Sequence, residues 1–161
     1  MAHGIPKGFH TVTPYLTIRD ASAAIAFYQR AFGAEEEFRH AGPDGRLIHA
    51  RIRIGDSLVM LSEEFLEWGA KSPLAFDGSP VTLHIYSEDV DAAWERAVTA
   101  GATITMPLDN QFWGDRYGQV KDPYGHNWSL AQHLEDLSPE ETNRRAAEAF
   151  SQMGDGPPDA K

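Results

Sequence analysis

The sequence predicts an α+β protein built from two tandem βαβββ modules. The order strand, helix, three strands occurs twice, and the two copies align at both ends of their helices. Internal repetition of this kind indicates that one structural unit is used twice. The matching residues are Asp20, Ala23, Ala24, Gly33 and Ala34 in the first copy and Asp89, Ala92, Ala93, Gly101 and Ala102 in the second.

The first copy begins with a predicted strand over Thr11–Ile18, where apolar and polar residues alternate. Asp20 is an expected helix N-cap, and Gly33 is the expected stop of that helix. Three strands separated by Gly-containing turns follow the helix. They are Ala34–His40, Leu47–Ile54 and Ser57–Ser62.

The second copy begins with a predicted strand over Val81–Ser87. Asp89 is expected to cap a helix from Val90 to about Ala100, which Gly101 ends. The three strands that complete this copy are predicted at Thr103–Met106, Tyr117–Lys121 and Asn127–Gln132.

These elements divide the chain into an N-terminal extension (1–10), a first module (11–62), a linker (63–80), a second module (81–133) and a C-terminal segment (134–161). The linker is rich in Gly, Pro and Ser but carries aromatic residues, so it either walls a pocket or packs on a sheet. Ser138 and Pro139 are typical of a helix start. We expect a short polar helix through Met153 and a disordered tail after it.

Composition excludes several functional classes. The 161 residues include no cysteine, which rules out disulfides, thiolate metal sites and cysteine nucleophiles. The chain has no apolar run of the roughly 20 residues needed to cross a membrane, and its N-terminus lacks the apolar core of a secretory signal. We therefore expect a cytoplasmic protein with no membrane partner.

The net charge of −10 argues against nucleic acid as a partner, because the phosphate backbone favours Lys and Arg. From residue 134 to 161, seven acidic and three basic residues contribute −4, and the rest of the chain carries −6. Such an acidic surface either attracts a cationic ligand or simply keeps the protein in solution.

Several motifs within residues 11–133 resemble the vicinal oxygen chelate superfamily (glyoxalase, bleomycin resistance and dioxygenase proteins), and more narrowly its PhnB-like branch. The matching segments are Val12-Thr13-Pro14-Tyr15-Leu16, Ala24-Ile25-Ala26-Phe27-Tyr28, Phe32-Gly33-Ala34, Phe112-Trp113-Gly114-Asp115-Arg116-Tyr117-Gly118 and Asp122-Pro123-Tyr124-Gly125-His126-Asn127-Trp128. The resemblance implies that the two modules curl into half-barrels around a cavity. It does not decide function, because members include metal-dependent enzymes and metal-free drug-binding proteins.

The resemblance also implies where a metal ion would bind, with one ligand on each of four strands. Counting from the flanking motifs places these positions at Thr13, Met60, Thr82 and Ser129. Three hydroxyls and a thioether do not suit a divalent first-row metal. The sequence therefore predicts no metal site and no cofactor. A shift of two residues at the third position would bring in His84.

Histidines offer an alternative metal site. His84 shares a strand face with Thr82, His49 lies on another strand, and His10 precedes the first strand. If they converged, they could bind Zn, Fe, Mn or Ni. If they do not, they line the pocket or the surface. His84 and His49 are also the candidate catalytic residues for acid–base chemistry.

Four further residues are candidates for the ligand pocket. Tyr15 shares a strand face with Thr13, and Arg51 shares one with His49. Trp113 and Arg116 occupy a glycine-containing loop, where they could hold a planar or anionic ligand. Alternatively, Arg116 pairs with a neighbouring acid such as Asp115, and Arg51 faces solvent.

Three functions remain open at this point. The first is a metal-free protein that binds a small drug-like or aromatic molecule and assembles as a homodimer. The second is a metal-dependent lyase, isomerase or dioxygenase that uses the histidines. The third is a metal-free acid–base enzyme. The sequence leaves open whether the protein is an enzyme.

Overall fold

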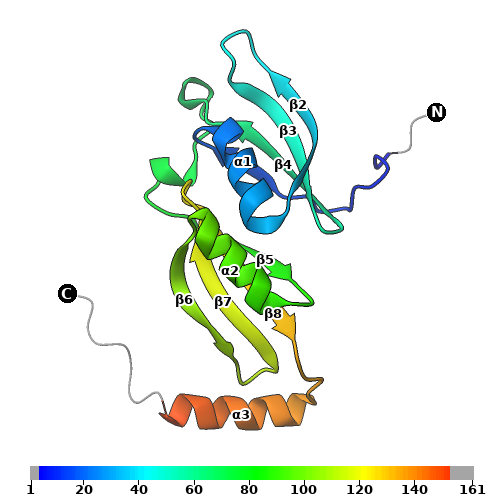
Figure 1. The fold of residues 1–161 in the computed structure, drawn as a ribbon, viewed down its shortest axis with the longest axis vertical. Helices are drawn as coiled ribbons and strands as arrows, with labels where there is room; N and C mark the ends of the chain where they lie inside the picture. The colour runs from blue at the N-terminus through cyan, green and yellow to red at the C-terminus, as the bar shows by residue number, and fades with distance from the viewer. Residues whose placement is uncertain (1–3, 153–161) are drawn as a thin grey trace.

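A computed structural model describes residues 4–152, and it confirms the predicted α+β architecture of two βαβββ modules (Figure 1). The first module contains β1 (Tyr15–Ile18), α1 (Ala21–Phe32), β2 (Glu35–Ala41), β3 (Leu47–Ile54) and β4 (Ser57–Glu63). The second contains β5 (Thr82–Tyr86), α2 (Val90–Ala100), β6 (Thr103–Asn110), β7 (Asp115–Lys121) and β8 (Asn127–His133). The helix α3 (Pro139–Gln152) follows.

Each module forms one four-stranded sheet, in the order β1-β4-β3-β2 for the first and β5-β8-β7-β6 for the second. The first strand of each module pairs in parallel with the last strand, and the remaining pairs are antiparallel. A parallel pair needs a crossover connection, which the module's helix provides.

The helices begin and end where the sequence predicts. The Asp20 carboxylate accepts a hydrogen bond from the backbone N–H of Ala23 at 3.1 Å, and Asp89 accepts one from Ala92 at 3.0 Å. Both helices end at a glycine with positive φ, Gly33 in α1 and Gly101 in α2.

The two helices join the modules through one core. In Figure 1, α1 and α2 lie next to each other on the same side of the two sheets. Phe32 of α1 packs on Trp128 of β8 with 4.5 Å between ring centroids, and both side chains are buried. Because this contact joins α1 of the first module to a strand of the second, the modules are held together by apolar packing.

The buried carboxylate of Asp122 adds a polar tie between the modules. It accepts hydrogen bonds from the Tyr28 hydroxyl at 2.7 Å, the Trp128 indole at 2.9 Å, and the backbone N–H groups of Tyr124 and His126, both at 2.9 Å. Burial is the main reason that the pKa of Tyr28 lies well above its usual value. Tyr28 is therefore a neutral donor in this tie.

The linker contains two short 3-10 helices, Leu66–Trp68 and Pro73–Ala75. It is anchored by Glu64, whose buried carboxylate accepts hydrogen bonds from the Ser72 backbone N–H at 2.9 Å and hydroxyl at 2.7 Å. The other carboxylate oxygen pairs with Arg19 at 2.8 Å.

Two element boundaries differ from the sequence prediction by four residues, and the other strand boundaries by at most two. The strand β1 begins at Tyr15 and not at Thr11, because Pro14 has no N–H to donate. The strand β6 continues to Asn110 instead of ending at Met106, through two irregularities in its pairing with β7. The predicted end of α3 at Met153 and the tail after it lie outside the described residues. No helix within residues 4–152 is both long and apolar enough to span a membrane.

Candidate functional site

The candidate site is the face of each sheet that the helices do not cover. Alternation along a strand sends successive side chains to opposite faces. In β8, Trp128 and Leu130 point to the helices, so Ser129 and Ala131 point to the other face. We call these two surfaces the first and second helix-free faces.

A pair of rings occupies the centre of the first helix-free face. The Tyr15 hydroxyl lies 2.9 Å from Nδ1 of His49, and the two ring centroids are 5.5 Å apart. Phe38 adds a third ring, 5.9 Å from His49. Tyr15 is 49% exposed and Phe38 is 46% exposed, so solvent reaches this face.

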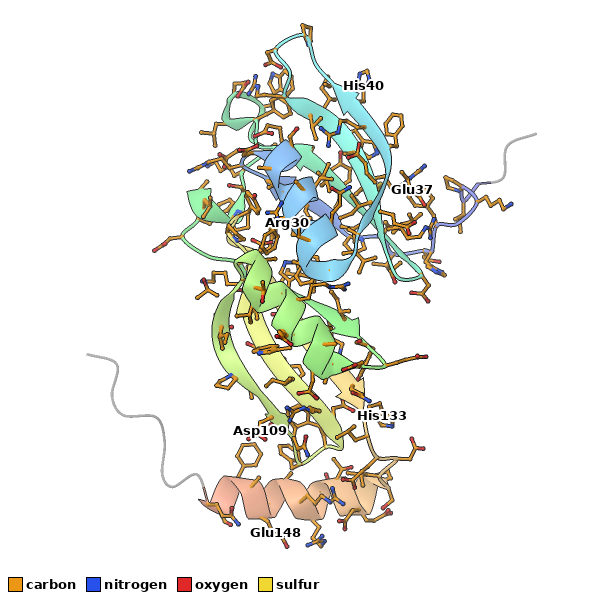
Figure 2. The ribbon with its side chains drawn as sticks, in the orientation of Figure 1. Arg30, Glu37, His40, Asp109, His133 and Glu148 are labelled. Carbon is orange, nitrogen blue, oxygen red and sulfur yellow. The ribbon has the colours of Figure 1, made fainter. Side chains whose placement is uncertain are left out.

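The charges of the first helix-free face are paired within it. Glu37 of β2 forms ion pairs with Arg53 and with Arg51, whose Nε lies 2.9 Å from the carboxylate but outside hydrogen-bond geometry. Figure 2 shows Glu37 on the side of β2 that faces the N-terminal segment. From that segment, the Phe9 ring lies 5.2 Å from the Arg51 guanidinium.

The second helix-free face carries an imidazole among tyrosines. His84 Nδ1 lies 2.7 Å from the hydroxyl of Ser129, which is only 1% exposed. The His84 ring meets Tyr86 edge to face at 4.5 Å and stacks with Tyr117 at 5.8 Å. Burial lowers the pKa of His84, so its neutral form is favoured. The Tyr117 hydroxyl accepts a hydrogen bond from Gln119 at 2.7 Å.

The carboxylate of Asp115, 6% exposed, lies next to these rings. Its Oδ2 accepts hydrogen bonds from the Tyr86 hydroxyl at 3.1 Å and the Trp113 indole at 3.2 Å. Its Oδ1 lies 2.8 Å from His133 Nδ1, and His133 Nε2 lies 2.9 Å from Asp136. Hydrogen bonds to Asp136 and to Asp115 raise the pKa of His133. Figure 2 shows His133 at the end of β8 that faces α3.

The side chains of His84, Tyr86, Trp113 and Tyr117 form what we call the ring cluster. Trp113 joins it by an edge-to-face contact with Tyr117, at 5.5 Å. The Tyr86 side of the cluster is open, since that residue is 61% exposed. Rings fixed by hydrogen bonds at their polar atoms present preorganised faces to a ligand.

The loop that carries Trp113 is held by the segment leading to α3. The carbonyl oxygen of Gly114 accepts hydrogen bonds from the backbone N–H groups of Leu134 at 2.9 Å and Glu135 at 3.1 Å. Gly114 has a φ of 95°, and an added Cβ would lie 2.7 Å from the Glu135 carbonyl oxygen. Only glycine fits this position without a shift of the backbone.

A cavity of about 700 Å³ lies at the junction of the modules, along the open edge of β5. It is lined by the segment from His10 to Pro14, the turn between β3 and β4, and residues of β5 that include His84 and Tyr86. Its volume falls within the range of small-molecule sites, roughly 300–1,000 Å³. The cavity and the ring cluster therefore share two residues.

Strand pairing locates the cross-strand neighbours of Met60 and Ser129. Met60 pairs with Tyr15, and Ser129 pairs with His84. These neighbours lie two residues beyond Thr13 and Thr82, the positions reached by counting from the helix caps. The four residues so placed offer a phenol, a thioether, an imidazole and a hydroxyl. This donor set does not fit a divalent metal.

The histidines do not supply the missing donors. His49 lies beside Tyr15 in the first module and His84 beside Ser129 in the second. Within residues 4–152, no group of three or more His, Asp or Glu side chains is arranged to hold a metal ion.

The structure divides the sequence-predicted pocket residues among four places. Tyr15, His49, Arg51 and Met60 lie on the first helix-free face; Thr82, His84, Trp113 and Ser129 lie on or beside the second; Thr13 precedes β1 and lines the cavity. Arg116 lies elsewhere, because its neighbours in β7 point to the helix-free face and it points to the helices. Its guanidinium pairs there with Asp91 of α2 at 2.7 Å, not with Asp115.

Four residues of the second helix-free face are not among the site residues predicted from the sequence: Tyr86, Asp115, Tyr117 and His133. A signal existed for Tyr86, which has the same strand parity as His84. The other three depend on the pairing of β7 with β8, which sequence patterns do not determine.

The fold and these faces define a class, namely small proteins of paired βαβββ modules with a polar and aromatic face on each sheet. Within that class, the family model of the Glyoxalase/Bleomycin resistance protein/Dioxygenase superfamily matches residues 8–130. The chain belongs to this superfamily.

Comparisons with individual proteins agree. The chain is 46% identical over 148 residues to protein Mb0911c of Mycobacterium bovis, a match that covers 90% of the chain and 95% of that protein. It is similar in structure to TioX from Micromonospora sp. ML1, with a TM-score of 0.60, 25% identity, and coverage of 80% of this chain and 100% of that one. The PhnB protein from Bacillus cereus has the same fold, with a TM-score of 0.58, 20% identity, and coverage of 76% and 99%.

Proposed function

We propose that this protein binds a small aromatic or drug-like molecule and needs no metal ion to do so. The ring cluster carries this proposal. Its four side chains lie within contact of one another, are fixed by hydrogen bonds to Ser129, Asp115 and Gln119, and remain partly open to solvent. Such surfaces bind planar ligands by stacking and add a few directional polar contacts.

The chemistry of the residues on the helix-free faces favours binding over metal catalysis. The cross-strand neighbours Tyr15 and Met60 offer no strong donor for a divalent ion, and His84 is a single imidazole already engaged by Ser129. A metal-dependent isomerase or dioxygenase needs three or four convergent ligands. A metal enzyme is therefore the less supported alternative.

One observation favours a second candidate, a metal-free acid–base enzyme. Burial lowers the pKa of His84, and the residue lines the cavity. A neutral imidazole at a cavity wall can accept a proton from a bound substrate. This role would need the Nε2 atom, since Nδ1 contacts Ser129.

We further propose that the protein works as a homodimer. The helix-free faces expose Tyr15, Phe38 and Tyr86, each more than 45% accessible in the single chain. Covering such rings with a second copy would remove apolar surface from water and enclose a bound ligand. Light scattering of the purified protein tests this, and a monomer at micromolar concentration would contradict it.

The test of ligand binding is a screen of aromatic compounds by thermal shift, followed by calorimetry of the hits. We expect Tyr86→Ala and Trp113→Ala to weaken binding about tenfold or more, because each removes a ring face. Trp68→Ala is the matched control, since Trp68 is an exposed tryptophan of the linker, 72% accessible. Hits that bind both site variants as tightly as the wild type would contradict the proposed site.

The metal question is decided separately by elemental analysis of untagged protein, before and after addition of Zn, Fe(II), Mn or Ni. We expect less than stoichiometric metal throughout. A stoichiometric ion that is lost in His84→Ala or His49→Ala would make the metal-dependent enzyme the better proposal.

A further inference from the structure

We propose that the ring cluster selects an organic cation, such as a quaternary or protonated amine carried on a flat ligand, because Tyr86, Trp113 and Tyr117 gather around the buried carboxylate of Asp115. This inference rests on the proposed binding function and names its ligand class. Aromatic faces attract cations through the ring quadrupole, and the attraction grows where water is partly excluded.

The hydrogen bonds of the site favour a cation. Tyr86 and Trp113 both donate to the same oxygen of Asp115, at 3.1 and 3.2 Å. Donation to an anion pushes electron density into each ring, which strengthens the negative potential over its face. The carboxylate thus fixes two rings and makes both better cation acceptors.

The local charge points in the same direction. Asp115 and Asp136 flank His133, so these three side chains sum to −1 when His133 is protonated and to −2 when it is neutral. The basic residue on the same face of β7, Lys121, is six residues from Asp115, or about 20 Å along the strand. Arg116 is turned to the other side of the sheet and paired with Asp91.

The first helix-free face also carries a carboxylate and aromatic rings, and it can be compared with the ring cluster. There the carboxylate of Glu37 is neutralised by Arg51 and Arg53, and Arg51 also lies on the ring of Phe9. An arginine of the first module therefore already lies on a ring of the N-terminal segment. The ring cluster of the second module has no such internal arginine among its described contacts, so a cation from outside would meet no competing internal cation at the exposed ring of Tyr86.

An anionic ligand fits the ring cluster poorly. Its charge would lie next to Asp115, which is 6% exposed and therefore weakly screened by solvent. A neutral aromatic ligand can stack on the rings but gains nothing from the carboxylate. The order of affinity for one ring system should therefore be cation, then neutral, then anion.

The experiment uses three probes that share one ring system: N-methylquinolinium, quinoline and quinoline carboxylate. Their affinities for the full chain are measured by calorimetry near neutral pH at low ionic strength. We expect the cation to bind about tenfold more tightly than quinoline, and the anion to bind most weakly. Added salt should reduce both the advantage of the cation and the disadvantage of the anion relative to quinoline, and it should leave the affinity for quinoline itself unchanged.

Variants assign the preference to the site. Asp115→Asn keeps an acceptor for the two rings but removes the charge, so the cation-to-neutral ratio should fall severalfold. Tyr86→Leu removes a ring face and should also lower this ratio. Glu37→Gln is the matched control, because it removes a carboxylate from the first helix-free face, and it should leave the ratio unchanged. If Asp115→Asn does not fold, as judged by its melting temperature, Tyr86→Leu decides alone.

The possible failures are distinguishable. If quinoline binds as tightly as its cation, or the ratio survives in both Asp115→Asn and Tyr86→Leu, the cation inference is wrong while the binding function stands. If none of the three probes binds at millimolar concentration, the cation inference is again wrong, and the broader compound screen decides the proposed function.

Discussion

The two helix-free faces share a backbone plan but treat charge differently. Strand pairing gives equivalent cross-strand rows, Tyr15–Met60–Arg51 in the first module and His84–Ser129–Gln119 in the second. In the first module, Glu37 forms ion pairs with Arg51 of this row and with Arg53, which lies two residues further along β3. In the second, the carboxylate of Asp115 holds rings instead.

The opposite sides of the same sheets are much more alike. Ala50 pairs with Leu61 in the first module, and Gly118 pairs with Leu130 in the second. Each pair places a small residue beside a buried leucine under the helices. The helix-covered sides of the two modules therefore share a packing pattern that supports the common scaffold, while the helix-free sides differ in chemistry.

The largest loss of stability is expected at Asp122, whose hydrogen bonds join the two modules that carry the two helix-free faces. Asp122→Ala removes the acceptor of four hydrogen bonds from Tyr28, Trp128, Tyr124 and His126, and leaves buried donors unpaired. We expect a loss of about 3–5 kcal/mol in the free energy of unfolding, measured by urea titration. Tyr28→Phe removes one donor only and should cost about 1–2 kcal/mol. A loss below about 1 kcal/mol in Asp122→Ala would show that the modules do not need this tie.

A smaller effect is expected on the helix-covered side of the second module. An added Cβ at Gly118 would lie 2.6 Å from the Trp94 ring and 2.9 Å from the Leu108 backbone. Gly118→Ala should therefore cost about 1–3 kcal/mol through overpacking. Gly45→Ala is the control at an uncrowded turn with positive φ, where only backbone strain applies. Equal losses would mean that Trp94 can move aside and that crowding at Gly118 costs nothing beyond backbone strain.

The attachment of the linker to the first module should weaken in acid. The ion pair with Arg19, helped by Ser72, lowers the pKa of Glu64 from 4.5 to about 2. A carboxyl with a lowered pKa stabilises the fold above about pH 4.5, and this stabilisation is lost as the pH falls towards 2. Glu64→Gln should lower the melting temperature by about 2–4 °C at neutral pH. Melting curves across this range should show a flatter acid limb in the variant, and parallel limbs would contradict the assignment.

The smallest effect concerns His133, which faces Asp115 and Asp136 and, through Asp115, Tyr86. Its raised pKa means that it stabilises the fold fully below about pH 6.5, and that this contribution disappears as the pH rises through the raised value. His133→Gln should therefore lower the melting temperature in mild acid and less at higher pH. The affinity for an organic cation should run the other way, rising with pH in the wild type and staying level in the variant. An equal rise in both proteins would assign it to another group.

The sequence predicted the scaffold because its signals are local. Asp20 and Asp89 cap their helices through contacts three residues away, and Gly33 and Gly101 end them by adopting positive φ. The repeat then indicated two modules without any knowledge of how strands pair. The start of β1 was missed because Pro14 interrupts the ladder, although the alternation continues upstream of it.

The candidate site was predicted only in part, because it depends on register. Counting from the helix caps reached Thr13 and Thr82, whereas strand pairing places Tyr15 and His84 beside Met60 and Ser129. Residue parity alone allows either pair. Arg116 shows the limit most clearly, since one step along β7 separates it from Asp115 and places it on the opposite side of the sheet.

Two hydrogen bonds to the carbonyl oxygen of Gly114 couple the segment that leads into α3 to the loop that carries Trp113 of the ring cluster. The backbone N–H groups of Leu134 and Glu135 donate to this oxygen, which adjoins Trp113. In addition, the Phe150 ring of α3 lies 6.1 Å from the Phe112 ring, measured between centroids. Figure 1 shows α3 lying across the end of the second module. A fluorophore attached to α3 should therefore change its emission when a ligand binds to the ring cluster. A bulky protein fused to α3 should in turn alter the affinity of the ring cluster for that ligand.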